Sequence, residues 1–337
     1  MLSEEEVISV VNDCLPSGKG RISIPFSHDA EVCSFTGDRL LFSTDEFSDE
    51  DLFPDENPFA LGWNIAAGAI SDIIATGGIP EYYAHALTIG RNWDIPYLKK
   101  FCNGVAQVLS RYDVTFIGGD TGKAENYRCT SSVIGKPIGN SIGRVGASAS
   151  DLIFSSGRFG GGNFNAALSL FGGNGPAVKL ANLNAVKFST LPLYASLIMQ
   201  FASSCIDTSD GLFLSVETLA GQNNLGYSIE KIPLLKRGIV AAKVLSLPVP
   251  LLFFAECGEY ELLFTVSPEN VQAMKAAAQK LGCSPLCLGK MMAKYDERKI
   301  RFGASTFNGT SMNIYGRDFI DPKDYLKEVT KWITINQ

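Results

Sequence analysis

The sequence predicts a mixed α+β protein built from two domains. Its 337 residues are about twice the length of a common single domain, which is roughly 150 residues. Short apolar segments typical of strands alternate with helical patterns through both halves of the chain. Between the halves, residues 139–150 are rich in Gly, Ser and Ala, as connections often are. We therefore expect an N-terminal domain over residues 1–146 and a C-terminal domain over residues 147–337.

The N-terminal half carries clear helix and turn signals. Ser3 and Glu6 form a capping box for a short helix, and Gly37-Asp38 is a hairpin turn pair. Asn57-Pro58 supplies the N-cap and first residue of a long helix. The expected elements are a helix at 3–12, strands at 30–36 and 39–43, a helix from 58 toward 77, a strand at 82–89, a helix at 96–111, and strands at 114–117 and 129–136.

The C-terminal half repeats this mixture. A strand at 152–156 leads into the glycine-rich segment 157–163 and then a helical pattern. That segment is a weak signal for a phosphate-binding loop, because glycine-rich turns between a strand and a helix are common. The other expected elements are a strand at 203–206, a helix at 210–220, strands at 251–255 and 261–266, a helix from Ser267-Pro268-Glu269 through 281, and a strand at 287–290.

Composition excludes several classes of function. With 29 basic and 35 acidic side chains the net charge is −6, which argues against a general binder of nucleic acid or anionic membranes. The N-terminus lacks the pattern of a signal peptide, and the apolar stretch 238–255 is broken by Lys243, Pro248 and Pro250. The eight cysteines form no CxxC pair. We expect a soluble protein in a reducing, cytoplasmic compartment.

Acidic residues are concentrated in one part of the chain. From Ser27 to Asp72 there are eleven Asp or Glu and a single basic residue, Arg39. Seven of the twelve residues at 45–56 are acidic. A charge run is usually a solvated face, so this acidity alone does not establish a site.

Five short segments place an Asp at a strand end or on the inner face of an apolar helix. They contain Asp29, Asp45, the helix stripe Asn64-Gly68-Asp72, Asp120 after Gly118-Gly119, and Asp207 with Asp210. Carboxylates gathered in one cleft repel each other unless cations neutralise them, and hard oxygen ligands suit Mg²⁺ bound with substrate phosphates. The chain has no GxxxxGK[ST] loop, so a nucleotide triphosphate would be held through metal instead.

Each segment also has a structural interpretation. Asp45 can open a solvated acidic loop, and Gly118-Gly119-Asp120 can be an ordinary turn. Thr208 or Ser209 can cap the helix that follows, with Asp210 in its first turn. His85 on its strand fits a core or cross-strand residue. The joint occurrence of the acidic segments is what favours a site.

The ordered motifs resemble a known family. They are Ser27-His28-Asp29-Ala30, Thr44-Asp45, Asn64 with Ser71-Asp72, Gly118-Gly119-Asp120-Thr121, residues 143–147, residues 207–212, Tyr260-Glu261-Leu262 and Asp318-Phe319. This order resembles the thiamine-monophosphate kinase family of the aminoimidazole ribonucleotide synthetase superfamily, over essentially the whole chain.

The resemblance implies a fold and a set of roles. It implies an N-terminal domain whose sheet pairs with a second subunit in a homodimer, a C-terminal α/β domain, and ATP bound with Mg²⁺. The implied metal ligands are Asp29, Asp45, Asp72, Asp120 and Asp210, of which Asp120 and Asp210 are also catalytic. The implied nucleotide contacts are Thr44, Asn64, Ser71, Gly119, Thr121, Arg144 and Ser209. The implied substrate contacts are Glu259, Tyr260, Glu261 and Phe319.

The sequence also departs from the family pattern. His28 stands where the family usually has an Asp, and Leu52 and Asp318 each replace a His that precedes a Phe. Residues 256–258 differ from the usual Gly-rich motif, and the metal and nucleotide motifs match better than the substrate motifs. The expected reaction is transfer of a phosphoryl group from ATP to thiamine phosphate. Two alternatives remain: an ATP-dependent enzyme of the same superfamily that acts on a different small acceptor, and a dimeric nucleotide-binding relative without catalysis.

Overall fold

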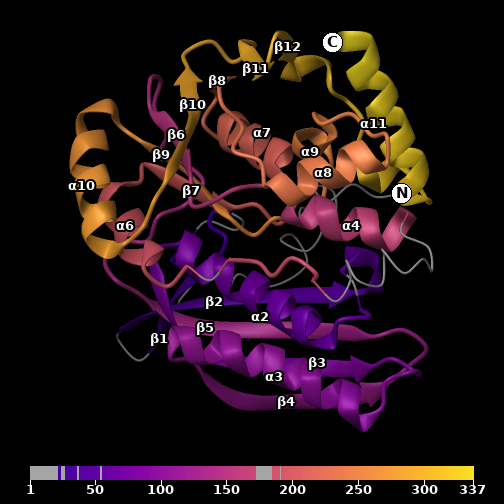
Figure 1. Ribbon diagram of the computed structural model, residues 1–337. Helices are drawn as coiled ribbons and strands as arrows, with labels where there is room; N and C mark the ends of the chain where they lie inside the picture. The colour runs from indigo at the N-terminus through magenta and orange to yellow at the C-terminus, as the bar shows by residue number, and fades with distance from the viewer. Residues whose placement is uncertain (1–21, 24–26, 36–37, 54, 172–183, 190) are drawn as a thin grey trace, which may run out of the picture.

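Two mixed sheets with their helices form the computed structural model, one above the other (Figure 1). The structure describes residues 22–23, 27–35, 38–53, 55–171, 184–189 and 191–337. The helix expected at 3–12 and the turn residue Gly37 lie outside the described residues. The two-domain α+β prediction is confirmed.

The N-terminal sheet has five strands in the order β1-β2-β5-β3-β4. β3 and β4 are parallel, and the other neighbouring pairs are antiparallel. β4 is an edge strand and is exposed along almost its whole length. The strands are β1 (Glu31–Phe35), β2 (Asp38–Ser48), β3 (Gly78–Ile89), β4 (Thr115–Lys123) and β5 (Arg128–Pro137).

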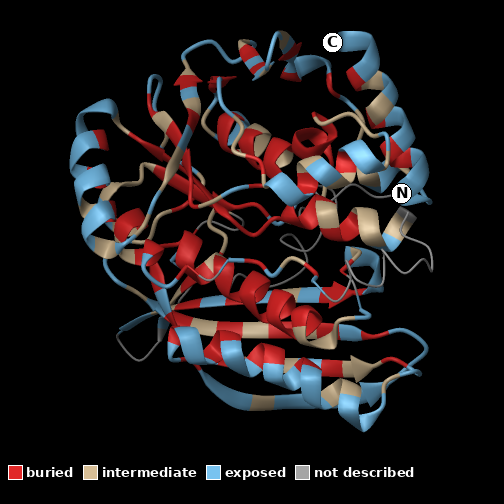
Figure 2. Ribbon diagram, in the orientation of Figure 1, coloured by how far each residue is buried: buried red, intermediate tan, exposed pale blue. Residues whose placement is uncertain are grey.

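Helices α2 (Pro58–Ala75) and α3 (Ile95–Tyr112) pack on this sheet (Figure 1). As predicted, Asn57 is the N-cap of α2, and its Oδ1 accepts a hydrogen bond from the Ala60 amide at 3.0 Å. α2 is long and apolar enough to cross a bilayer, yet 89% of it is buried inside the protein. Figure 2 shows it as an almost wholly buried helix between the two sheets. It is therefore a core helix, and its polar side chains need partners inside the protein.

Two glycines let α2 and α3 approach closely. A Cβ at Gly104 of α3 would lie 2.1 Å from the carbonyl oxygen of Phe59, and one at Gly62 of α2 would lie 2.1 Å from that of Phe101. Because both obstacles are backbone atoms, only a shift of a whole helix could make room.

We expect Gly104→Ala to lower the free energy of unfolding by about 1–3 kcal/mol, the common cost of overpacking. Urea titration would measure it. Gly221→Ala is the matched control, since its Cβ would meet nothing within 4 Å and the change should stabilise its helix by up to about 1 kcal/mol. Equal effects of the two variants would contradict this account of the packing.

The C-terminal sheet has seven strands in the order β12-β11-β8-β10-β6-β9-β7. β7, which ends beside α2, is its edge strand. The strands are β6 (Leu152–Ser155), β7 (Ser204–Asp207), β8 (Gly226–Ile229), β9 (Leu262–Val266), β10 (Leu286–Met292), β11 (Arg298–Phe302) and β12 (Ser305–Asn308). The α-helices are α4 (Gly161–Phe171), α6 (Tyr194–Phe201), α7 (Leu212–Gln222), α8 (Lys236–Val244), α9 (Leu251–Phe254), α10 (Val271–Leu281) and α11 (Pro322–Asn336).

Most expected elements are present, but one has the wrong type and three are too short. The strand expected at 82–89 begins at Gly78 as β3. Residues 251–254 form the helical turn α9 instead of a strand, because Pro248 and Pro250 start a turn and a short apolar run has no periodicity that separates strand from helix. β2 continues to Ser48 and β4 to Lys123. Asp45 and Asp120 therefore lie within strands, not in loops that follow them.

The hydrophobic core crosses from one domain to the other. One cluster of buried side chains includes α2 residues such as Ile70 and Ile74 together with Phe154, Cys205 and Phe264 of the C-terminal sheet. α2 thus contacts β7 directly. This contact places the acidic residue of α2 opposite the acidic end of β7.

Candidate active site

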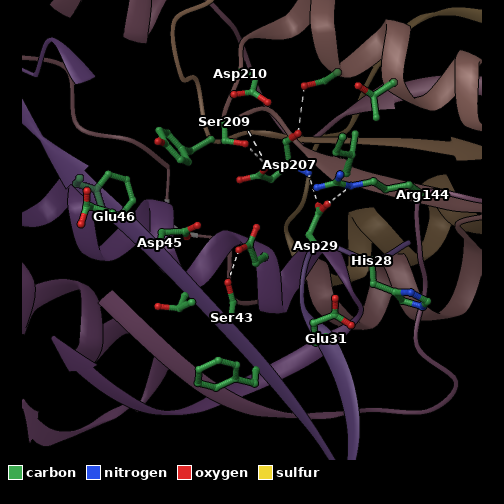
Figure 3. A pocket seen from close by; sticks show the side chains of 18 of the residues that line it. His28, Asp29, Glu31, Ser43, Asp45, Glu46, Arg144, Asp207, Ser209 and Asp210 are labelled. Carbon is green, nitrogen blue, oxygen red and sulfur yellow. Dashed lines mark hydrogen bonds and ion pairs between the residues drawn. The ribbon is translucent and has the colours of Figure 1, made fainter. Parts of the chain in front are cut away.

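A cavity of about 650 Å³ lies where β2, α2, β7 and α7 meet. Acidic side chains from both domains line it, and Figure 3 shows Asp29, Asp45 and Asp207 directed toward the same central space. Arg144 is the one Lys or Arg among the described residues that line this cavity. The predicted residues that it brings together are Asp29, Thr44, Asp45, Asp72, Arg144, Ser209, Asp210 and Tyr260.

Three carboxylates form the centre of the cavity. One oxygen from each of Asp29, Asp72 and Asp207 lies within 4.8 Å of the others. The backbone amide of Asp207 donates to Oδ2 of Asp29 at 2.8 Å, and Oγ of Ser71 donates to Oδ2 of Asp207 at 2.6 Å. The hydroxyl of Ser43 donates to Asp72. The triad is therefore oriented by fixed donors before any ligand binds.

Burial and the close approach of these acids raise their pKa values. Burial, together with the charge of Asp207, raises the pKa of Asp29 to about 6, although Arg144 opposes the change. Burial and the neighbouring charges of Asp207 and Asp29 raise the pKa of Asp45 to about 7. Burial and the charge of Asp45 likewise raise the pKa of Asp72 well above its usual range. Arg144 alone does not balance the negative charge of these carboxylates, and a bound cation would supply more positive charge.

Arg144 and His28 lie on the side of Asp29 away from Asp45. The Arg144 guanidinium forms an ion pair with Asp29. Nδ1 of His28 is 2.8 Å from the hydroxyl oxygen of Ser27, and Figure 3 shows the ring turned away from the triad. His28 therefore lines the cavity without entering the carboxylate cluster.

Tyr260 forms part of the cavity wall in an unusual backbone conformation. Its φ is +52°, a left-handed value that is rare for a bulky side chain. Its ring packs against Phe188, with centroids 4.7 Å apart, and against Phe47. Gly68 of α2 leaves room for it, because a Cβ there would lie 2.9 Å from Cε1 of Tyr260.

The stripe predicted on α2 has three different roles. Asp72 belongs to the triad, and Gly68 accommodates the Tyr260 ring. Asn64 lies outside the cavity lining: its Oδ1 accepts from the Phe188 amide at 2.9 Å and its Nδ2 donates to the Val186 carbonyl at 3.1 Å. A buried amide on this helix therefore fixes the segment that carries Phe188.

The predicted residues on β4 lie away from the triad within one chain. Gly119, Asp120 and Thr121 are not among the described residues that line the cavity. They are exposed on β4 at the edge of the N-terminal sheet, where Oδ1 of Asp120 accepts from the Thr121 amide at 2.8 Å. Gly119 has a φ of +149° and passes so close to His85 that a Cβ would lie 1.8 Å from its carbonyl oxygen.

Glu259 binds the backbone amides of the glycine-rich segment, which the sequence suggested as a weak candidate for a phosphate-binding loop. Its Oε2 accepts from the amides of Gly161 at 2.8 Å and Gly162 at 3.1 Å, at the start of α4. The protein's own carboxylate therefore occupies the donors that a phosphate would need. Phe319, another predicted substrate contact, packs on Tyr325 with centroids 5.8 Å apart and is not among the described cavity-lining residues.

Glu261 is buried between two serines. The hydroxyl of Ser189 donates to Oε1 at 2.5 Å, and that of Ser156 donates to Oε2. Burial raises the pKa of Glu261 to about 7 despite these donors. The folded protein therefore binds a proton here more tightly than the unfolded chain. The stability that this proton provides is complete below about pH 4.5 and is lost as the pH rises through 7.

We expect Glu261→Gln to raise the melting temperature at pH 8 and to give a smaller gain at pH 5, because the amide is neutral at both. Glu269→Gln, on the exposed turn before α10, is the control and should change neither value. A loss of stability at pH 8 would contradict the burial argument. Scanning calorimetry at the two pH values provides the comparison.

Sequence reasoning missed some lining residues. Asp207 was noted beside Asp210 but not assigned as a ligand, yet it is 2% exposed and belongs to the triad. The sequence predicts a strand over 203–206 and so places Asp207 just beyond it, whereas β7 ends on Asp207 itself. Asp51 also lines the cavity, because its carboxylate accepts from the Ser48 amide at 2.6 Å in a capped turn. This turn shows that the acidic run is not simply solvated.

Comparison with known proteins first defines a class. Residues 27–136 match the family model described as AIR synthase related protein, N-terminal domain. Over most of its length the chain is similar to thiamine-monophosphate kinases. That of Aquifex aeolicus is 28% identical over 249 residues, which cover 71% of this chain and 79% of the relative. That of Haemophilus influenzae is 25% identical over 307 residues, which cover 90% and 88%.

Solved structures share the fold. AaThiL complexed with AMPPCP and TMP has a TM-score of 0.72 and 23% identity, covering 87% of this chain and 91% of that one. The Escherichia coli hydrogenase maturation protein HypE has a TM-score of 0.63 and 19% identity, covering 79% of this chain and 83% of that one. At these identities the likeness establishes the two-domain fold alone.

Proposed function

We propose that this protein is an ATP- and Mg²⁺-dependent phosphotransferase that phosphorylates thiamine phosphate to thiamine diphosphate. The observation that carries the proposal is the triad of Asp29, Asp72 and Asp207 at the centre of a cavity large enough for a nucleotide. The thiamine-monophosphate kinases among its relatives support the acceptor, and so does the complex of AaThiL with AMPPCP and TMP.

The donor set fits Mg²⁺. All the candidate ligands are carboxylate oxygens, which this hard cation prefers, and no described His or Cys belongs to the triad. Burial, together with the neighbouring carboxylates, raises the pKa values of Asp29 and Asp45, and a bound cation would favour their charged forms. When bound, Mg²⁺ would neutralise phosphate charge during the transfer. The proposed ligands are Asp29, Asp45, Asp72, Asp120, Asp207 and Asp210.

The protein's own side chains would mainly position the reactants. Arg144 is placed beside the triad to contact a phosphate, and Thr44 and Ser209 add hydroxyl groups on the same cavity. Oγ of Ser209 donates to Oδ1 of Asp207 at 2.8 Å, which fixes the β7 end. No side chain needs to form a covalent intermediate, because in-line transfer depends on positioning and electrostatic stabilisation.

A product assay tests the proposal. The protein is incubated with ATP, Mg²⁺ and single acceptors, including thiamine phosphate, and the products are separated chromatographically. The proposal predicts equal amounts of ADP and thiamine diphosphate, and no product with EDTA. No thiamine diphosphate, with turnover of another acceptor, would overturn the assignment of the acceptor but keep the enzyme class. Tight binding of an ATP analogue without any turnover would favour the inactive relative.

A different acceptor is the second candidate. The fold is shared with HypE as well as with thiamine-monophosphate kinases, so the fold alone does not identify the acceptor. The departures at Leu52, residues 256–258 and Asp318 affect motifs expected to contact the acceptor. Gly316 donates its amide to Oε2 of Glu256 at 3.0 Å, which ties the two altered C-terminal segments together.

We also propose a homodimer that forms through the N-terminal sheet. Its edge strand β4 exposes two large apolar side chains, Phe116 at 50% and Ile117 at 55%. The mass of the protein in solution tests this, and a strict monomer would count against it. A cytoplasmic location is proposed with it, since the cysteines of the described residues are all free.

A further inference from the structure

The cavity does not end at the carboxylates. It also includes His28, Glu31, and Thr218 and Gln222 of α7; we call these four residues the α7 arm. Figure 3 shows His28 on the opposite side of Asp29 from Asp45 and Glu46. The phosphoryl-transfer chemistry proposed above uses none of the four.

The arm offers neutral hydrogen-bonding groups. Thr218 and Gln222 are one helical turn apart and so share a face of α7. In the described part of the chain neither side chain has a hydrogen-bond partner, although other polar side chains of this wall do. A hydroxyl and a carboxamide both donate and accept hydrogen bonds. They therefore suit a ligand that carries both donors and acceptors rather than a simple ion.

The other two residues of the arm, His28 and Glu31, are held by their neighbours. The His28 ring is held at Nδ1 by the Ser27 hydroxyl, and Gly143 lies directly behind it, since a Cβ there would be 3.1 Å from Nε2. Glu31 accepts a hydrogen bond from Ser23. The arm therefore combines a fixed imidazole with the half-buried Thr218 and the exposed Gln222.

Charged side chains are unevenly distributed around the cavity. The carboxylates of the triad and Asp45 are close together, and Arg144 is beside Asp29. The arm has one carboxylate, Glu31, which already accepts a hydrogen bond. A phosphorylated heterocycle has the matching asymmetry, with a charged phosphate end and a neutral ring end that carries donors and acceptors. Phosphates held at the carboxylates would direct the ring toward the arm.

We propose that the α7 arm binds the ring end of a phosphorylated nitrogen heterocycle, and that Thr218 and Gln222 determine specificity for that ring. This inference rests on the proposed function, because it takes the phosphates to lie at the carboxylates. Two ligands have such a ring, the nucleoside of ATP and the acceptor. The experiment distinguishes them.

The test compares the double variant Thr218→Val, Gln222→Met with the wild type. KM and kcat are measured separately for ATP and for thiamine phosphate, and calorimetry measures the binding of magnesium tripolyphosphate, which has no ring. We expect the KM for one substrate to rise about tenfold, the effect of one or two lost hydrogen bonds. We expect kcat to change by less than about twofold, since ground and transition states lose the same contact. Tripolyphosphate binding should not change.

The matched control is Gln279→Met on the exposed face of α10, which should behave as wild type. An unchanged KM for both substrates, in an enzyme that turns over normally, would contradict the proposal that the arm binds a ring and would leave the proposed function unaffected. Weaker tripolyphosphate binding would also overturn it, because the damage would then extend to the carboxylates. A wild-type protein that binds neither ATP nor thiamine phosphate would overturn the proposed function and this inference together.

Discussion

Asp72→Asn is expected to lower turnover by at least ~100-fold, the loss typical of an electrostatic catalytic group. Asp72 is the one member of the triad that comes from α2, and Ser43 donates a hydrogen bond to it. Asparagine keeps the shape but removes the charge that would attract Mg²⁺. A steady-state assay of ADP release at saturating ATP and acceptor measures the effect.

A second readout separates a charge effect from simple damage. Without metal, the three carboxylates repel each other, so Asp72→Asn should raise the melting temperature in EDTA while it removes the additional stabilisation by Mg²⁺. Asp113→Asn is the control: Asp113 is exposed, has a φ of 56° at the end of α3, and is replaced by a residue that tolerates this conformation. Near wild-type turnover and an intact response to Mg²⁺ would exclude the triad as the metal site.

Asp120→Asn is expected to cause a loss of similar size, although Asp120 lies outside the cavity of its own chain. Asp120 is exposed on the edge strand β4, which the proposed homodimer would cover. If a second copy brings Asp120 to the triad, each site contains residues from two chains. Size-exclusion chromatography checks that the variant still forms the dimer.

Subunit complementation tests that arrangement. Asp72→Asn and Asp120→Asn proteins are unfolded together, refolded as a mixture and assayed. Half of the dimers would be mixed, and each mixed dimer would have one intact site, so about a quarter of wild-type activity should return. Full activity of Asp120→Asn alone would remove Asp120 from the site. No recovery in the mixture, with both variants inactive, would contradict the shared arrangement.

Much of the site could be predicted because the acids stand next to apolar strands or on an apolar helix. Asp29 and Asp72 were assigned from local pattern and resemblance, and the structure places both in the triad. Asp207 was not assigned because the sequence does not show where β7 ends relative to α7. A strand that ends at Asp207 buries this carboxylate, while Asp210, three residues later, is exposed at the cavity.

Other differences between the predicted and the observed roles of residues come from contacts between segments that are distant in the sequence. Nothing near Asn64 in the sequence indicates that its amide binds the backbone at Val186 and Phe188. In the same way, Glu259 fills the start of α4 from almost one hundred residues away. Because α2 is buried on nearly all sides, only the packed fold decides whether a polar group on this helix meets a ligand or the chain itself.

The central claim is that the acidic cavity binds a nucleotide through Mg²⁺. Isothermal titration calorimetry with a non-hydrolysable ATP analogue tests it most directly, in Mg²⁺ and in EDTA, with wild type and with Asp72→Asn. The account predicts binding to the wild type in Mg²⁺, no measurable binding in EDTA, and strongly weakened binding to the variant. Equal binding with and without Mg²⁺, or no binding in either buffer, would contradict it.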